Sequence, residues 1–230
     1  MQVTLLPIDS FTHIKIDRSS TTQLDSDTQQ RIDDAWSDLC AQNPKYFNAP
    51  IVAFDRYDPD TGVIFAYVDQ YKHHAVRDSV ELDLSLLAVT SIVMAEDRVL
   101  LGKRSARSHR YGGLWELGPS GGVDVPNEAD RIDLASLLGE ALREIREEAG
   151  FEPRVIDHQL VALVHDHLVG SSDLAVLLRI ERPDQLKANW EYSDTRWMTL
   201  DELIAWVNDK PDELIPTTVS LARFLHETIG

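Results

Sequence analysis

Four glutamates and one arginine are crowded into the segment from residue 140 to residue 148. These residues are Glu140, Arg143, Glu144, Glu147 and Glu148. At about 100° per residue, all five side chains fall on one side of a helix. Like charges at i,i+4 spacing repel by a few tenths of a kcal/mol per pair, so the cluster gains nothing structurally. A hard divalent cation, Mg²⁺ or Mn²⁺, would turn this repulsion into attraction by binding the carboxylates together with phosphate oxygens of a substrate.

The ordinary alternative is a solvated helix face, because Glu and Arg are good helix formers. We expect the helix to run from about Arg131 to Ala149, with Gly150 ending it in a left-handed conformation. Its predicted core-facing stripe consists of Leu134, Leu138, Ala141 and Ile145.

A long loop rich in glycine, residues 105 to about 130, precedes this helix. Glycines let backbone groups approach a ligand closely. Basic residues gather at its start, namely Lys103, Arg104, Arg107 and Arg110. Carboxylates beside arginines fit a metal-bound polyphosphate, with the metal on the inner oxygens and the arginines on the outer ones.

The net charge of the chain limits the kinds of molecule that it can bind. Its 230 residues carry 39 acidic and 22 basic side chains, a formal net charge of −17. A surface of this sign repels polyanions, so we expect no nucleic-acid partner. Cys40 is the single cysteine, which excludes an internal disulfide and favours a reducing, cytoplasmic location. The longest apolar stretch, residues 84–95, is too short to cross a bilayer, and we expect neither a signal peptide nor a membrane partner.

The elements that must position the acidic helix divide into two groups. Residues 1–80 predict a small α+β subdomain: a strand within 3–16, a helix with Ser26 as N-cap, and a hairpin of 51–57 and 63–69. Residues 81–230 predict strands at 84–94, 99–104, 160–166, 174–180 and 196–198, with closing helices at 200–207 and 217–228. Strands around one acidic helix, with more helices at the end, predict an α/β sandwich.

The run from Arg143 to Phe151 resembles the second half of the Nudix box, Gly-x5-Glu-x7-Arg-Glu-U-x-Glu-Glu-x-Gly-U, and matches every specified position of that half. The Trp115–Gly122 run resembles the loop that leads into the box. The first half departs from the pattern. About seven residues are inserted, and Ala135 occupies the expected position of the upstream glutamate, with Glu128 and Glu140 as stand-ins. The resemblance implies a Nudix-type α/β/α sandwich with a mixed sheet.

Carried over position by position, the resemblance implies that Glu144, Glu147 and Glu148 bind Mg²⁺, or Mn²⁺, with the Gly122 carbonyl. Arg143 is implied to orient the glutamates by salt bridging. The general base of the family varies, and it is Glu144 itself or a carboxylate from a later loop, with Glu191 ahead of Asp194. Further expected substrate contacts are Arg104, Arg110 and Trp115.

The implied reaction is hydrolysis of a diphosphate linkage in a nucleoside diphosphate joined to another moiety. The region Ala35–Pro50 is similar to the N-terminal region of the animal Nudix enzymes that cleave UDP-glucose and UDP-galactose to UMP and sugar 1-phosphate. A UDP-sugar is therefore the first expectation for the substrate, and ADP-ribose or another nucleotide sugar is the alternative. An oxidised nucleoside triphosphate and a non-catalytic, nucleotide-binding Nudix module also stay open. Dimers are frequent in the family, which leaves a homodimer open as well.

Overall fold

The computed structural model describes residues 2–8, 10–44, 46–108, 110–183 and 191–229. These form two compact units, each built from separate stretches of the chain. The larger unit comprises residues 1–9, 88–121 and 135–230, and the smaller unit comprises residues 10–87 and 122–134. The predicted division into residues 1–80 and 81–230 stays a prediction.

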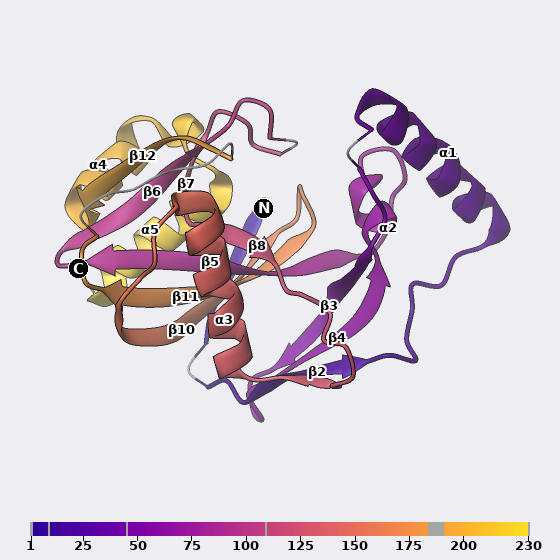
Figure 1. Ribbon diagram of the computed structural model, residues 1–230, viewed down its shortest axis with the longest axis horizontal. Coiled ribbons are helices and arrows are strands. Elements are labelled where there is room, and N and C mark those ends of the chain that lie inside the picture. Colours follow the sequence, from indigo (N-terminus) through magenta and orange to yellow (C-terminus); the bar gives the residue numbers. More distant parts are fainter. Residues whose placement is uncertain (1, 9, 45, 109, 184–190, 230) are drawn as a thin grey trace. The chain divides into compact units, whose positions relative to one another are not determined.

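The smaller unit contains a β-hairpin extended by further strands (Figure 1). Its elements are β2 (His13–Asp17), α1 (Ser26–Gln42), β3 (Pro50–Asp58), β4 (Val63–Gln70), α2 (Tyr71–Ala75) and β9 (Arg131–Ile132). β3 and β4 pair antiparallel, as the hairpin pattern predicted, and β2 runs parallel to β4. Short β9 pairs with the other side of β2.

Helix α1 begins one residue earlier than the sequence suggested. Asp25, not Ser26, is its N-cap, because the Asp25 carboxylate accepts a hydrogen bond from the backbone N–H of Thr28. Ile32 is fully buried, and the predicted apolar face of the helix packs against Val76 and Val80. The helix is thereby fixed beside α2.

The larger unit contains most of the strands and the acidic helix. Its elements are β1 (Val3–Pro7), β5 (Ser85–Ala95), β6 (Arg98–Arg104), β7 (Trp115–Leu117), β8 (Ser120–Gly122), α3 (Leu134–Glu144), a π-helical turn (Ile145–Ala149), β10 (Val155–Asp166), β11 (Ser171–Ile180), β12 (Tyr192–Thr199), α4 (Leu200–Asp209), a 3₁₀ turn (Pro211–Glu213) and α5 (Pro216–Ile229). The first residues of β5, the last of β8 and the first of α3 belong to the smaller unit.

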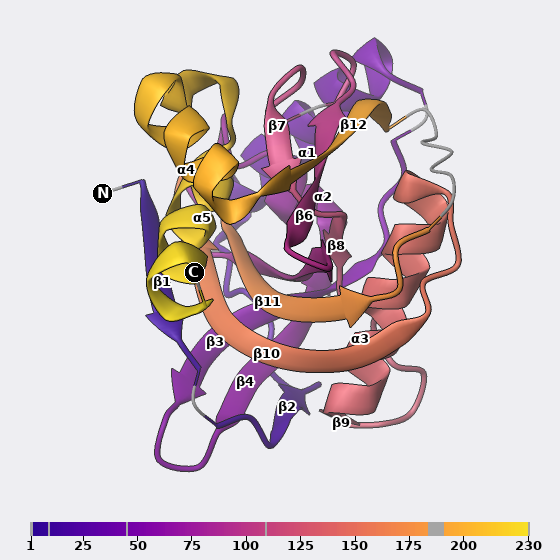
Figure 2. The same cartoon turned by 90° about the vertical axis from the view of Figure 1, so that its left-hand side faces the viewer.

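The strands of the larger unit pair in two connected series. One runs β1, β10, β11, β5, and the other runs β12, β6, β7, with β6 also paired to β5. Figure 2 shows β10 and β11 as long strands that curve side by side. The core between these strands and the last helices includes fully buried Leu101 and Leu203. Helix α5 contacts α4, β1 and β10, and Thr199 and Glu202 start α4 with a capping box.

These elements confirm the predicted α/β class with a mixed sheet, since parallel and antiparallel pairs both occur. The interpretation of residues 105–130 as one loop was wrong, because β7 and β8 form within it. The acidic helix begins at Leu134, not Arg131, since Arg131 and Ile132 pair with β2. Among the helices of the described residues, none has the length and apolarity that crossing a membrane requires.

Candidate active site

The predicted acidic helix changes its winding where the glutamates lie. Helix α3 ends at Glu144, and the next five residues form a π-helical turn that stops at Gly150, whose φ of 70° is left-handed as predicted. The buried side of this segment includes two charged residues, Glu144 and Glu148, each 7% exposed. Such single π-helical turns are rare and occur frequently at functional sites.

The predicted core stripe was therefore partly wrong. Ala141 and Ile145 are fully buried, as expected, but Leu134 and Leu138 are only half-buried, and Leu137 takes the core position. On the wheel that places Glu140 at zero, Leu137 lies at about 60°, next to Glu144 at about 40°. The buried arc thus includes Glu144, which was expected on the opposite side, and Glu148 is buried as well, in the π-helical turn that follows.

Arg143 binds the exposed edge of the cluster together. Its guanidinium lies 2.9 Å from the Glu140 carboxylate, 2.8 Å from that of Glu144 and 3.0 Å from that of Glu147. This geometry suits the orienting role that the motif implies for Arg143. Of the two stand-ins for the upstream glutamate, Glu140 belongs to this ion-pair network, whereas Glu128 lies in the smaller unit.

Glu148 is the most perturbed carboxyl of the site. Burial raises its pKa to about 10, helped by a hydrogen bond with Glu191 and by the charges of Glu116 and Glu144. Its Oε2 atom is buried and has no hydrogen-bond partner among the described residues. We call Glu116, Glu144, Glu148 and Glu191 the glutamate site. A carboxyl in this position is neutral at pH 7 unless a cation compensates its charge.

Glu144 is held against the backbone of β8. Burial raises its pKa, the Arg143 guanidinium opposes that change, and the charges of Glu147, Glu191 and Glu140 add to it. A Cβ atom at Gly121 would lie 2.1 Å from Oε1 of Glu144. Only glycine at that position leaves room for the carboxylate as it stands.

The sequence analysis missed Glu116, a charge within the apolar run Trp115–Leu117 of β7. Its side chain is 1% exposed, and Nη1 of Arg104 donates to both of its oxygens at 2.7 and 2.9 Å. Burial still raises the pKa of Glu116. The ring of Tyr192 packs directly over Gly102, where a Cβ would approach it to 2.3 Å. The sequence signal that could have identified Glu116 is a charged residue between the apolar residues Trp115 and Leu117.

The other predicted residues lie in varied settings. Arg104 is engaged by Glu116, and its Nε donates to the Arg110 carbonyl. Trp115 is 5% exposed and packs against Trp206, with the Arg196 guanidinium 4.6 Å from its ring centre. This burial does not favour the predicted contact between Trp115 and a substrate.

The two candidate bases differ in position. Glu191 is half-buried within the glutamate site, and its carbonyl accepts a 2.6 Å hydrogen bond from the Ser105 N–H. Asp194 is exposed, and its carboxylate accepts from the Thr195 N–H. Glu191 is therefore the better placed of the two. Gly122 begins the second segment of the smaller unit, and its assignment to a metal stays a prediction.

The chemistry of this donor set fits a hard divalent cation. Glu144 and Glu148 have buried carboxylates, and Oε2 of Glu148 forms no hydrogen bond to any described residue. A cation bound to this oxygen would stabilise its charge. Mg²⁺ needs only one or two carboxylates because it keeps several waters. With the side chains placed as they are, no set of three His, Cys, Asp or Glu residues in the described ranges forms a complete metal cluster. Glu147, with 57% of its side chain exposed, is ion-paired to Arg143.

Comparison with known proteins identifies the class of this chain. The NUDIX domain model matches residues 85–218, more than half of the sequence. The chain belongs to the Nudix domain family, as the motif around Glu144 predicted. A search of curated proteins found no match.

Several solved structures are similar to part of this chain. The MutT protein of Methanosarcina mazei Go1 is 21% identical, with a TM-score of 0.45 over 64% of this chain and 96% of that one. The NUDIX domain of Shewanella oneidensis NrtR, complexed with ADP ribose, is 21% identical, with a TM-score of 0.48 over 64% and 89%. A bifunctional NMN adenylyltransferase/ADP ribose pyrophosphatase of Francisella tularensis, complexed with AMP and a Mn ion, is 16% identical, with a TM-score of 0.47 over 70% and 46%. Similarity at this level does not indicate the substrate of this chain.

Proposed function

We propose that this protein is a divalent-metal-dependent Nudix hydrolase that cleaves the diphosphate linkage of a nucleoside diphosphate joined to a second moiety. The observation that carries the proposal is the pair Glu144 and Glu148, buried within the family motif, with one oxygen of Glu148 that forms no hydrogen bond to any described residue. Buried carboxylates with raised pKa values gather at functional sites far more than in structural cores. A purely structural helix would place apolar side chains there.

Glu144 and Glu148 would hold the cation, Mg²⁺ or Mn²⁺. When bound, the cation supplies positive charge that activates a water molecule and stabilises charge on the phosphate oxygens. Arg143 holds Glu144 in place through its 2.8 Å ion pair. Arg104 compensates the buried charge of Glu116 within the glutamate site.

The carboxylate of Glu191 is our candidate for the general base. It takes the proton of the attacking water, one oxygen–phosphorus bond forms, and the bridging oxygen–phosphorus bond breaks. The products are two monophosphates, and the net reaction consumes one water.

The proposed substrate is a UDP-sugar, giving UMP and sugar 1-phosphate. The support is the similarity of residues 35–50 to UDP-sugar-cleaving animal Nudix enzymes, although Lys45 of that run lies outside the described residues. A cytoplasmic location fits this substrate and the single cysteine. ADP-ribose, dinucleoside polyphosphates and coenzyme A are the competing substrates, and a binding module without catalysis is the competing function.

Chromatography of the products formed from UDP-glucose, UDP-galactose and these competitors, with Mg²⁺ or Mn²⁺, tests the proposal. We expect UMP and sugar 1-phosphate at the highest kcat/KM. Glu191→Gln should lower kcat by about 10²–10⁴-fold, as removal of a general base does, while Asp194→Asn, the matched exposed carboxylate, should leave it unchanged. Ligand-induced thermal stabilisation without any product would instead identify a binding module and overturn the hydrolase assignment.

A further inference from the structure

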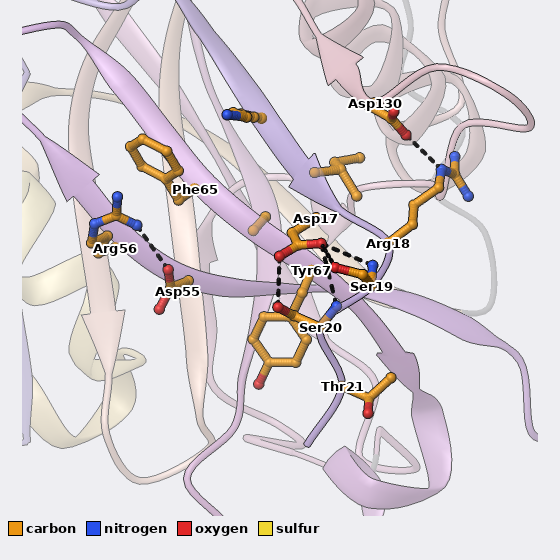
Figure 3. Close-up of a pocket in the computed structure, with 13 residues that line it drawn as sticks. Asp17, Arg18, Ser19, Ser20, Thr21, Asp55, Arg56, Phe65, Tyr67 and Asp130 are labelled. Atoms are coloured by element: carbon orange, nitrogen blue, oxygen red, sulfur yellow. Dashed lines mark hydrogen bonds and ion pairs between the residues drawn. The ribbon is translucent and has the colours of Figure 1, made fainter. Parts of the chain in front are cut away.

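The smaller unit contains two pockets that the glutamate site does not use. The first has a volume of about 770 Å³, and Figure 3 shows Arg56 and Arg18 each paired with an aspartate, while Asp17 accepts hydrogen bonds from Ser19 and Ser20. Arg56 pairs with Asp55 at 3.0 Å and lies 3.5 Å from the centre of the Phe65 ring. Arg18 pairs with Asp130 at 2.9 Å. Both arginines of the first pocket are thus compensated by neighbouring aspartates.

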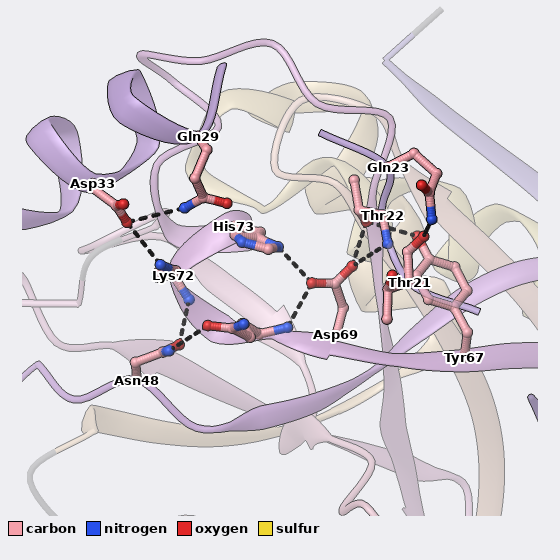
Figure 4. A network of polar contacts seen from close by, with 11 residues as sticks. Thr21, Thr22, Gln23, Gln29, Asp33, Asn48, Tyr67, Asp69, Lys72 and His73 are labelled. Carbon is pink, nitrogen blue, oxygen red and sulfur yellow. Dashed lines mark hydrogen bonds and ion pairs between the residues drawn. The ribbon is translucent and has the colours of Figure 1, made fainter. Parts of the chain in front are cut away.

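The second pocket, about 740 Å³ in volume, contains a buried Asp–His pair, and we call it the His73 pocket. His73 and Asp69 are each 6% exposed, and Nδ1 of His73 lies 2.5 Å from Oδ1 of Asp69 (Figure 4). The other Asp69 oxygen accepts from the Thr22 N–H at 3.2 Å and from the Thr22 hydroxyl. Burial would raise the pKa of Asp69, but these bonds and one from the Gln70 N–H lower it below its ordinary value. Asp69 is therefore a carboxylate that fixes the His73 ring.

The second nitrogen of His73 has no hydrogen-bond partner in the part of the chain that the structure describes. This Nε2 atom is buried. In the neutral imidazole, Nδ1–H donates to Asp69, so Nε2 carries a lone pair and accepts. A buried acceptor without a donor costs stability, about 1–3 kcal/mol, unless something else supplies the hydrogen bond. Because His73 lines the pocket, a ligand can supply it.

Apart from Arg18 and four apolar residues, the rest of the lining is uncharged and polar. It offers the amides and hydroxyls of Thr21, Thr22, Gln23, Gln29, Asn48 and Gln70. Gln29 donates from Nε2 to Asp33 at 3.1 Å, which leaves its amide oxygen to accept. Gln70 accepts from Asn48 at 2.8 Å, which leaves its amide nitrogen to donate. The pocket thus presents donors and acceptors side by side without net charge.

This lining discriminates between kinds of ligand. Arg18, which also lines the pocket, is occupied by Asp130 and by the carbonyl of Ala129, so an anion lacks a cation to bind it. A metal ion would find only two metal-binding side chains in this lining, Asp69 and His73, and these are bonded to each other. A hydroxyl group donates and accepts at once, and it matches a surface of amides beside an imidazole acceptor.

We propose that the His73 pocket binds the vicinal hydroxyls of a sugar ring, with Nε2 of His73 accepting from one hydroxyl and the Gln29 and Gln70 amides contacting its neighbours. The volume lies within the range of small-molecule sites, about 300–1,000 Å³. The ring could be a free hexose or a ribose, which share this chemistry. Binding does not require turnover at the glutamate site, so the proposal stands or falls independently of the proposed hydrolysis.

Nitrogen-15 NMR of the full-length protein, labelled at histidine, reads this hydrogen bond directly. D-Glucose, D-galactose and D-ribose are titrated in separate arms, to about 100 mM, well above the millimolar Kd of a weak small ligand. Cyclohexanol, a ring with one hydroxyl, is the negative control. We expect a saturable shift of the His73 Nε2 signal with at least one sugar, and no change at exposed His158. The arm with the lowest Kd distinguishes hexose from ribose.

Two neighbouring residues of α1 offer a matched pair of variants. Gln29 and Gln30 make the same type of bond, to Asp33 at 3.1 Å and to Asp34 at 2.9 Å, but only Gln29 lines the pocket. Gln29→Ala should weaken sugar binding by about three- to tenfold, the loss of one hydrogen bond, while Gln30→Ala leaves it unchanged. The proposal is overturned if no sugar shifts the His73 signal, if cyclohexanol shifts it equally, or if both variants behave alike.

Discussion

The burial of Glu144 and Glu148 destabilises the metal-free protein, because both carboxyl groups lose their hydration. One oxygen of Glu148 gains no hydrogen bond from the described residues in return. The motif located both residues in the sequence. It could not show which glutamates are buried, since a helical wheel ranks angles but does not say where the core begins. Glu116 was missed for a related reason: its arginine partner is twelve positions away, and pairing between β6 and β7 brings them together.

Asp173 on β11 provides a pH test of this buried polar region. Burial raises its pKa from 3.8 to about 7, opposed by a hydrogen bond from Ser171 and supported by the charges of Asp166 and Glu116. Because this pKa is higher in the folded than in the unfolded protein, Asp173 contributes fully to the free energy of unfolding below pH 3.8. This contribution is lost as the pH rises to about 7. Between pH 5 and pH 8, wild type should lose about 2–3 kcal/mol that Asp173→Asn keeps.

Urea unfolding of both proteins at the two pH values measures this difference. Asp173→Asn should be the relatively more stable protein at pH 8 and lose that advantage at pH 5. An equal pH dependence in the two proteins would show that Asp173 is ionised in the folded state at pH 5.

At the level of the elements, the sequence predicted the acidic helix, the β3–β4 hairpin and the strands β5, β6, β10 and β11 from periodicity and turn residues. It did not predict β7 and β8, because strands of three residues lack a pattern long enough to detect. The π-helical turn could not be predicted from the sequence either, because its apolar and acidic residues are equally compatible with an α-helix.

Two glycines near the acidic helix predict opposite effects of an added methyl group. At Gly121, a Cβ would lie 2.1 Å from Glu144, whereas at Gly139 nothing lies within 4 Å. Gly139→Ala should stabilise the protein by about 0.5–1 kcal/mol. Alanine fits this exposed position of the folded helix, and it lowers the conformational entropy of the unfolded chain. Gly121→Ala should keep the fold, since a side chain can move aside, but should lower kcat at least tenfold by displacing Glu144.

Thermal unfolding and steady-state kinetics on the two variants check both effects. If Gly121→Ala retains full activity, the observed position of Glu144 is not needed for turnover. A destabilising Gly139→Ala would mean that α3 meets a neighbour at that position.

The whole molecule is strongly acidic, with 39 acidic and 22 basic side chains. Self-repulsion of this excess destabilises the folded state, and salt screens it. Raising NaCl from 0.02 to 0.5 M should therefore stabilise the protein by about 1 kcal/mol, which corresponds to a rise in Tm of roughly 2–4 °C. A calorimetric scan that showed Tm falling with salt would indicate that attractive ion pairs, such as those of Arg143, outweigh the repulsion.

The central claim is that the buried glutamates hold a divalent cation, and Mn²⁺ binding followed by electron paramagnetic resonance tests it most directly. NaCl at matched ionic strength separates specific binding from screening. Glu152, whose side chain is 71% exposed and pairs with Arg146, provides a control outside the glutamate site. Wild type and Glu152→Gln should bind Mn²⁺ with the same Kd, and Glu148→Gln should bind at least tenfold more weakly. Equal Mn²⁺ affinity in Glu148→Gln and wild type would contradict the account.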